Sequence, residues 1–82
     1  MSRKAKHPWM QEGGRRLRGR RTDLELSVAQ VAAMIGRSVA QVARYESGES
    51  DPMRPAITLA YARALRVRSL SRLYLDGIVE AV

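Results

Sequence analysis

The clearest apolar pattern lies in the middle of the chain, where it predicts two short helices. Val31, Ala32 and Ile35 recur at the spacing of a buried stripe, which indicates a helix over residues 28–35. Val42 and Tyr45 are the next two inward positions, and their helical spacing indicates a second helix over residues 39–47. Because the connection between the two segments is so short, we expect them to cross at a wide angle rather than to form an antiparallel hairpin.

Each of these helices is bounded by residues that commonly start and end helices. Ser27 and Ser38 stand where an N-cap hydroxyl would accept a hydrogen bond from a first-turn amide. Gly36 and Gly48 follow the last inward residues, and glycine adopts the left-handed conformation that ends many helices. Spacing and caps together predict a helix-turn-helix whose second helix turns one side to the core and the other to solvent.

The N-terminal part of the chain has a weaker pattern. Residues 1–12 show no apolar period, so we expect a basic, flexible arm that Trp9 could anchor. Gly13 and Gly14 weaken a helix start at their positions. The first helix is therefore expected over residues 15–23.

The C-terminal part predicts two further helices after a loop that contains two prolines. They are expected over residues 56–65 and 70–75, and Ser69 can cap the second of them. The folded domain would then span residues 13–77, followed by an apolar tail, residues 78–82, that docks on the domain or contacts another subunit. The fourth helix is expected to be buried through Ile57, Leu59, Ala60, Ala64 and Leu65.

Length and composition limit the fold to a single small domain. The 82 residues contain no Phe and one Trp, so the core must be built from small and aliphatic side chains, which favours closely packed short helices. We therefore expect an all-α fold, a compact bundle of five helices. No cysteine is present, which excludes disulfides and thiolate zinc sites, and no apolar run is long enough to span a membrane. A cytoplasmic location without membrane contact is the expectation.

The positive charge is concentrated at one end of the chain. Eight Lys and Arg residues and one Glu occur in the first 21 residues, which gives them a net charge of +7, whereas the remaining 61 residues are neutral overall. A cluster this one-sided favours a polyanion-binding surface over a merely solubilising one. Composition alone does not distinguish DNA, RNA and an acidic membrane as the partner.

Nothing in the sequence supports catalysis. His7 stands alone in the expected arm, without an acidic residue placed to orient it as a general base. The eight carboxylates are scattered, and Glu49 and Asp51 share a loop without a third ligand for a metal ion. Gly13 and Gly14 do not follow a strand, so they form no phosphate-binding loop. We expect a protein that is not an enzyme and uses no cofactor and no metal.

The motifs resemble those of one known family, the Cro/C1-type (lambda repressor-like, XRE-like) helix-turn-helix domains. The likeness runs over about residues 14–73 and is carried by "LRGRRTDLELS", "VAQVAAMIGRS", "VARYESG" and "ALRV". It implies a five-helix bundle that binds double-stranded DNA, usually as a homodimer, and regulates transcription, most often as a repressor. It also implies an ion pair between Arg21 on the first helix and Glu46 at the end of the third.

The resemblance assigns roles on DNA to two groups of residues. The third helix would lie in the major groove, with Arg44 positioned for guanine and Gln41 for adenine or a phosphate. The base-reading group is Val39, Ala40, Gln41 and Arg44. The group expected to contact the DNA backbone is Arg20, Arg37, Ser38, Ser47 and Arg54, together with Arg3, Lys4 and Lys6 of the arm, which could also enter the minor groove.

Two features depart from the family pattern. Val28 stands where the family often has a Gln that braces the DNA backbone. The loop after Gly48 begins with Glu49, Ser50 and Asp51, where the family is often basic, and its charge should repel phosphate. The fourth helix is also expected to begin about one residue later than in the family, which weakens the resemblance at Arg54. The basic N-terminal residues are expected to compensate for the missing backbone contacts.

Three hypotheses about function remain open at this stage. The first is a small homodimeric repressor, of a phage Cro or immunity-repressor type or an autorepressor in bacteria, that reads a pseudo-palindromic operator. The second is an antitoxin-type interaction module that holds a partner protein and binds DNA secondarily. The third, nonspecific coating of nucleic acid, predicts equal affinity for random duplexes.

Overall fold

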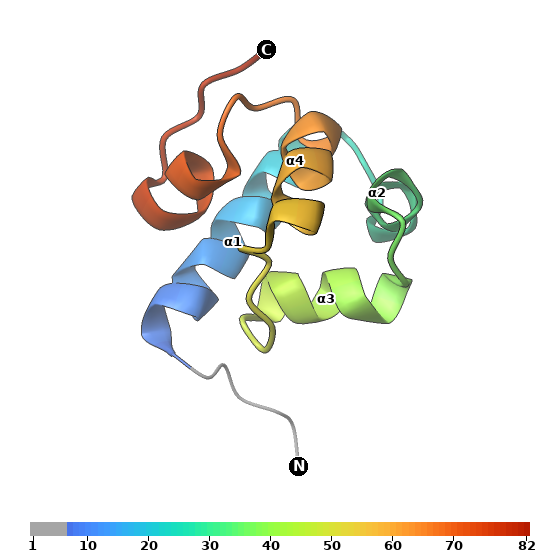
Figure 1. The fold of residues 1–82 in the computed structure, drawn as a ribbon, viewed down its shortest axis with the longest axis horizontal. Helices are drawn as coiled ribbons and strands as arrows, with labels where there is room; N and C mark the ends of the chain where they lie inside the picture. Colours follow the sequence, from blue (N-terminus) through green and yellow to red (C-terminus); the bar gives the residue numbers. More distant parts are fainter. Residues whose placement is uncertain (1–6) are drawn as a thin grey trace.

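A computed structural model describes residues 7–82 of the chain, and in this part the fold is built from helices (Figure 1). The helices pack around one core of aliphatic side chains and buried tyrosines, among which Tyr61, Tyr74, Leu17 and Leu65 are the largest that are fully buried. Residues 7–82 contain no β-strand, and their one sheet-like feature is an isolated antiparallel bridge between Val67 and Ala81. The elements are α1 (Pro8–Asp23), α2 (Val28–Ile35), α3 (Val39–Ser47), α4 (Pro55–Ala64) and a short π-helical turn η1 (Arg72–Asp76).

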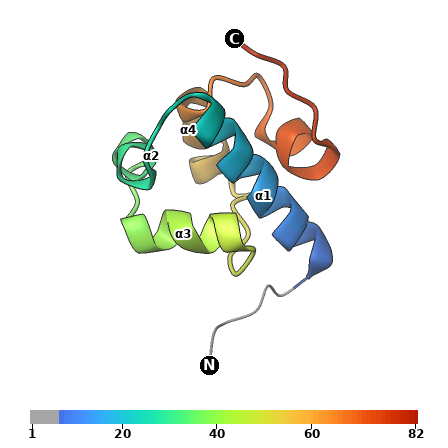
Figure 2. The same cartoon turned by 180° about the vertical axis from the view of Figure 1, so that it is seen from behind.

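The predicted helix-turn-helix is present with the predicted bounds. Ser27 begins α2 with a capping box, in which its hydroxyl accepts from the Gln30 amide and the Gln30 side chain accepts from the Ser27 amide. Gly36 ends α2 in the left-handed conformation, with a φ of 68°. Figures 1 and 2 show α2 nearly end-on where α3 lies lengthwise, so the two helices cross at a wide angle.

The first helix is longer than the sequence pattern predicts. It begins at Pro8, whose fixed φ suits the first turn, and not after the two glycines. A Cβ on Gly13 would overlap the ring of Tyr74, and a Cβ on Gly14 would overlap the backbone carbonyl of Glu46. The two glycines therefore allow α1 to approach η1 and α3 closely, and tertiary contact compensates for their poor helix propensity.

The fourth helix also differs from the expectation in its register. It begins at Pro55 and ends at Ala64, and Leu59, which we expected in the core, has a side chain that is 59% exposed. Tyr61 takes the inward position instead and is buried, with its ring 5.9 Å from that of Tyr45. The buried face of α4 thus combines an aromatic residue with small residues, which a pattern based on aliphatic residues alone does not reveal.

The C-terminal segment docks through its backbone. Ser69 caps the last helical turn as predicted, since its Oγ accepts from the amide of Arg72 at 3.2 Å. The tail then runs back along the end of α4, where Arg68 N donates to Glu80 O at 2.8 Å and Val82 N donates to Arg66 O at 3.0 Å. In Figures 1 and 2 this segment lies at the end of the molecule away from α3.

Candidate nucleic-acid interface

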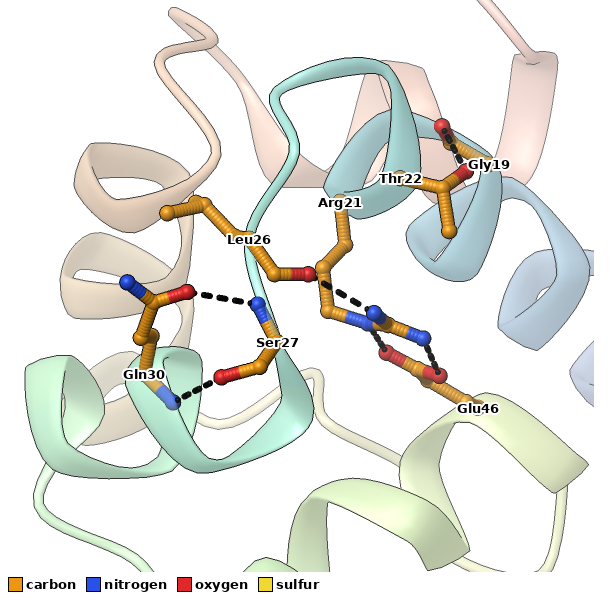
Figure 3. A network of polar contacts seen from close by, with 7 residues as sticks. All are labelled: Gly19, Arg21, Thr22, Leu26, Ser27, Gln30 and Glu46. Atoms are coloured by element: carbon orange, nitrogen blue, oxygen red, sulfur yellow. Dashed lines mark hydrogen bonds and ion pairs between the residues drawn. The ribbon is translucent and has the colours of Figure 1, made fainter.

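A buried ion pair fixes the position of α3 on α1. The Nε of Arg21 donates to Oε2 of Glu46 at 2.6 Å, and Nη2 donates to Oε1 at 3.0 Å (Figure 3). The third donor, Nη1, reaches the carbonyl of Leu26 at 2.8 Å, so one guanidinium joins α1, the turn before α2 and α3. The bond to Glu46 raises the pKa of Arg21, although burial opposes the shift. The structure contains the expected pair, with a bidentate geometry.

The outer face of α3 carries the four residues expected to read bases. Val39 and Ala40 are exposed at the start of the helix, and Val39 has 52% of its surface exposed. Gln41 and Arg44 are half-buried, and neither side chain has a hydrogen-bond or ion-pair partner within residues 7–82. Below this face, Val42 and Tyr45 are buried. The division of α3 into a buried and an open side therefore follows its sequence spacing.

Two residues expected to bind the DNA backbone and one expected to read bases meet at one open hollow of about 610 Å³. Arg37 reaches it from the turn before α3, Gln41 from α3, and Arg54 from the residue that precedes α4. Asp51 lies in the same hollow, which lowers the positive charge there. Trp9 forms part of the rim, so the N-terminal turn of α1 borders the same surface.

Ser38 combines a structural role with availability to a ligand. Its Oγ accepts a hydrogen bond from the amide of Gln41 at 3.1 Å and thereby caps α3. A serine hydroxyl that accepts in this way keeps its own proton for donation. The N-terminus of α3, where the helix dipole is positive, thus offers a donor beside Arg37.

Arg20, which the sequence analysis assigns to the DNA backbone, makes hydrogen bonds within the protein. Its Nε donates to the carbonyl of Leu65 at 2.8 Å, and its Nη2 donates to the carbonyl of Arg66 at 3.3 Å. These carbonyls follow the end of α4, where the negative end of the helix dipole attracts a cation, and the carbonyl of Arg66 also accepts from Val82 N. The guanidinium of Arg20 thus joins α1 to the end of α4, and its contact with the DNA backbone stays a prediction.

Ser47 is also engaged within the protein. Its hydroxyl donates to the carbonyl of Arg44 at 3.2 Å and lies 3.0 Å from Oε2 of Glu49. A carboxylate beside the hydroxyl is unfavourable for a phosphate, and the contact of Ser47 with the DNA backbone stays a prediction. The other members of that group, Arg3, Lys4 and Lys6, lie outside the described residues.

Arg16 plays a part that the sequence did not reveal. Its Nη1 donates to the carbonyls of Tyr74 at 3.0 Å and Leu75 at 2.8 Å, near the end of η1. Arg16 and Arg20 lie four residues apart on one face of α1, and this spacing was the available signal. When only their charges are considered, Arg16 and Arg20 indicate a surface that binds a polyanion. When their shared face of α1 is considered, the same two residues predict hydrogen-bond donors that face a neighbouring part of the chain.

Two other kinds of site, a metal cluster and a membrane-crossing helix, are not found in the described part of the chain. Residues 7–82 contain no group of three or more His, Cys, Asp or Glu side chains that could hold a metal ion. In the same range, no helix is both long enough and apolar enough to cross a bilayer. The outer face of α3 and the turn before it present the methyl groups of Val39 and Ala40, the amide of Gln41, the hydroxyl of Ser38 and the guanidinium groups of Arg37 and Arg44, which suit base edges and phosphates.

Comparison with known proteins places this arrangement in a family. The profile of a family described as "Helix-turn-helix domain" matches residues 13–73, most of the chain. The protein therefore belongs to the helix-turn-helix domain family, and its all-helical fold is that of the lambda repressor-like members. A comparison with curated proteins found no match.

Solved structures support the same placement. The P22 c2 repressor, in a complex with a synthetic operator, is 32% identical with a TM-score of 0.72, over 83% of this chain and 98% of that chain. The restriction-modification controller protein C.AhdI from Aeromonas hydrophila is 27% identical with a TM-score of 0.73, over 82% of this chain and 98% of that one. The clp gene regulator ClgR from Corynebacterium glutamicum, at 17% identity and a TM-score of 0.73 over 87% of this chain and 88% of that one, shares the fold.

Proposed function

We propose that this protein is a sequence-specific regulator of transcription that binds double-stranded DNA with α3 in the major groove, most simply as a small homodimeric repressor. One observation carries the proposal: the outer face of α3 is open, while its inner face is held on α1 by the Arg21–Glu46 pair. A fixed helix with an unpaired outer face is what major-groove reading requires. The similarity to a repressor crystallised with its operator supports the same reading.

The proposed division of labour follows the geometry of α3. Arg44, without a partner in the described part of the chain, donates to the O6 and N7 atoms of a guanine. Val39 and Ala40 offer methyl groups to thymine at the start of the helix, and Gln41 bonds an adenine or a phosphate. Arg37, Ser38 and Arg54 hold the adjacent DNA backbone and set the register of α3 in the groove.

Selection of bound sequences from a random duplex pool tests this proposal. Wild-type protein should enrich a pseudo-palindrome whose half-sites lie about 10 base pairs apart, or a multiple of this distance. Arg44→Ala should relax one position in each half-site and cost about 1 to 3 kcal/mol in binding to the selected site. Enrichment of a single asymmetric half-site would exclude the dimer, and enrichment of no sequence would indicate nonspecific coating.

A matched variant separates base reading from loss of charge. Arg63→Ala removes an equally charged side chain from the exposed surface of α4 and should leave the selected sequence unchanged. If Arg63→Ala and Arg44→Ala reduce affinity equally and neither alters the enriched sequence, Arg44 does not read a base. The roles of both arginines then reduce to long-range electrostatics.

A further inference from the structure

A second surface, at the end of α4, combines exposed apolar side chains with unpaired arginines. We propose that this surface docks an acidic segment of a partner protein that carries apolar side chains, and that it does so independently of DNA binding. The surface, called the α4 patch below, consists of Leu59, Ala62, Arg63, Arg66, Arg68 and Val82.

The floor of the α4 patch is hollowed and combines apolar side chains with the hydroxyl groups of Thr58, Ser69 and Ser71. Two adjoining hollows of about 290 and 300 Å³ meet at Ala62, which lines both of them. Leu59 borders one hollow and Val82 the other, and their side chains are 59% and 82% exposed. Apolar side chains at this exposure, beside concave surface, gain free energy when another apolar group covers them.

The rim of the α4 patch is basic. Arg63, Arg66 and Arg68 are exposed, and none of their guanidinium groups has a hydrogen-bond or ion-pair partner within residues 7–82. They contrast with Arg16, Arg20 and Arg21, whose guanidinium groups all donate to the protein. Unpaired cations around an apolar floor are complementary to carboxylates that flank apolar side chains.

Charge also distinguishes this occupant from a second copy of the chain. A two-fold symmetric contact places the same patch on both subunits. The three arginines of one copy would then lie close to the same three of the other, and none of the patch residues has an acidic side chain to pair with them. We therefore assign the patch to a different, acidic partner and leave self-association to other surfaces.

The α4 patch lies away from the proposed DNA interface. In Figures 1 and 2, α3 is at one end of the molecule, and the C-terminal segment with the end of α4 is at the other. An occupant of the patch would therefore not compete with a duplex held by α3. Binding of the partner and of DNA should be separable by mutation.

Titration of the labelled full chain with designed peptides tests the proposal. The probe is an amphipathic peptide with leucine at every third or fourth position and glutamate between, and the control peptide has lysine in place of each glutamate. We expect amide chemical shifts to move around Leu59, Arg63 and Val82 with the acidic peptide alone. Arg63→Glu together with Arg66→Glu should weaken this binding by about tenfold or more.

Two single variants separate the patch from the DNA interface. Leu59→Ser changes no charge and no buried side chain, and it should weaken peptide binding while DNA affinity stays unchanged. Arg44→Ala should do the reverse. The proposal is overturned if both peptides bind equally, if the shifts occur on α3, or if duplex DNA moves the patch signals. It is also overturned if sedimentation shows self-association that Leu59→Ser abolishes.

Discussion

Helices α1 and α3 both carry arginines that look alike in the sequence, yet the two helices use them differently. On α1, the guanidinium groups of Arg16, Arg20 and Arg21 donate to carbonyls or to a carboxylate of the protein itself. On α3, Arg44 has no such partner in the described part of the chain. A count of positive charges therefore overstates how many cations of α1 are available to bind DNA. The single arginine of α3 is available to bind a ligand, although α3 contributes little to the net charge.

The largest test of this contrast is the removal of a structural arginine. Arg21→Ala should lower the free energy of unfolding by about 3 to 5 kcal/mol, because it leaves the carboxylate of Glu46 buried without its partner. The measurement is urea denaturation followed by circular dichroism. Arg18→Ala, on the exposed side of the same helix, should stay within about 0.5 kcal/mol of wild type. Equal losses in the two variants would contradict the structural role.

The close approach of α1 to α3 is tested by two glycines on the same helix. Gly14→Ala should destabilise the protein by about 1 to 3 kcal/mol, since the new Cβ meets the backbone of Glu46. Gly19 has open space around its position, so Gly19→Ala should stabilise the protein by about 0.5 to 1 kcal/mol through helix propensity. Thermal unfolding of both variants measures the difference, and a stabilising Gly14→Ala would show that the helices are farther apart.

The contrast is sharpened by comparing Arg20 with Arg54 on DNA. Arg20→Ala should reduce stability by about 1.5 kcal/mol through lost charged hydrogen bonds, without changing how DNA affinity depends on salt. Arg54→Ala should leave stability unchanged and reduce the salt slope of binding by about one. Fluorescence anisotropy over a range of salt concentrations gives both slopes. A reduced slope for Arg20→Ala would return this residue to the DNA backbone group.

The smallest effect at neutral pH concerns two buried tyrosines. Burial raises the pKa of Tyr74 to about 12 and raises that of Tyr61 as well, from an ordinary value of 10.0. Both phenols stay protonated in the folded chain after the unfolded chain begins to lose its protons. Stability is therefore complete below about pH 10 and falls as pH rises through the folded values.

Denaturation at several alkaline pH values checks this expectation. Tyr61→Phe should flatten the loss of stability above pH 10, and at neutral pH it should cost little. The reason is that the buried hydroxyl of Tyr61 has no hydrogen-bond partner within residues 7–82. Tyr74→Phe provides the second comparison, and its hydroxyl bonds the carbonyl of Met10 at 3.4 Å. An unchanged alkaline slope in both variants would assign the loss to other groups.

The local signals of the sequence predicted α2 and α3 with their bounds, because caps and spacing act within a few residues. Ser27, Gly36, Ser38 and Gly48 each stand where the structure begins or ends a helix. The predicted start of the first helix is wrong, because Gly14 packs against Glu46, a residue far along the chain. Local propensity carries no information about such a partner.

The candidate site shows the same division between local and distant causes. The open and buried sides of α3 follow from its spacing, and the partner of Arg21 was expected from a family motif. The engagement of Arg20 depends on where the end of α4 lies, which no pattern on α1 specifies. The exposure of Leu59 follows from Tyr61 taking the inward position, a choice between neighbours that packing decides.

The residues that hold α3 and the residues that α3 turns outward do not overlap, and this has a consequence for the evolution of the protein. Gly14, Arg21 and Glu46 fix the helix from its inner side, where substitution is costly. Val39 and Ala40 are exposed and contribute nothing to that attachment. Under the proposed function, a lineage could therefore change the operator it recognises by single substitutions on the outer side, while selection for folding keeps the inner side constant.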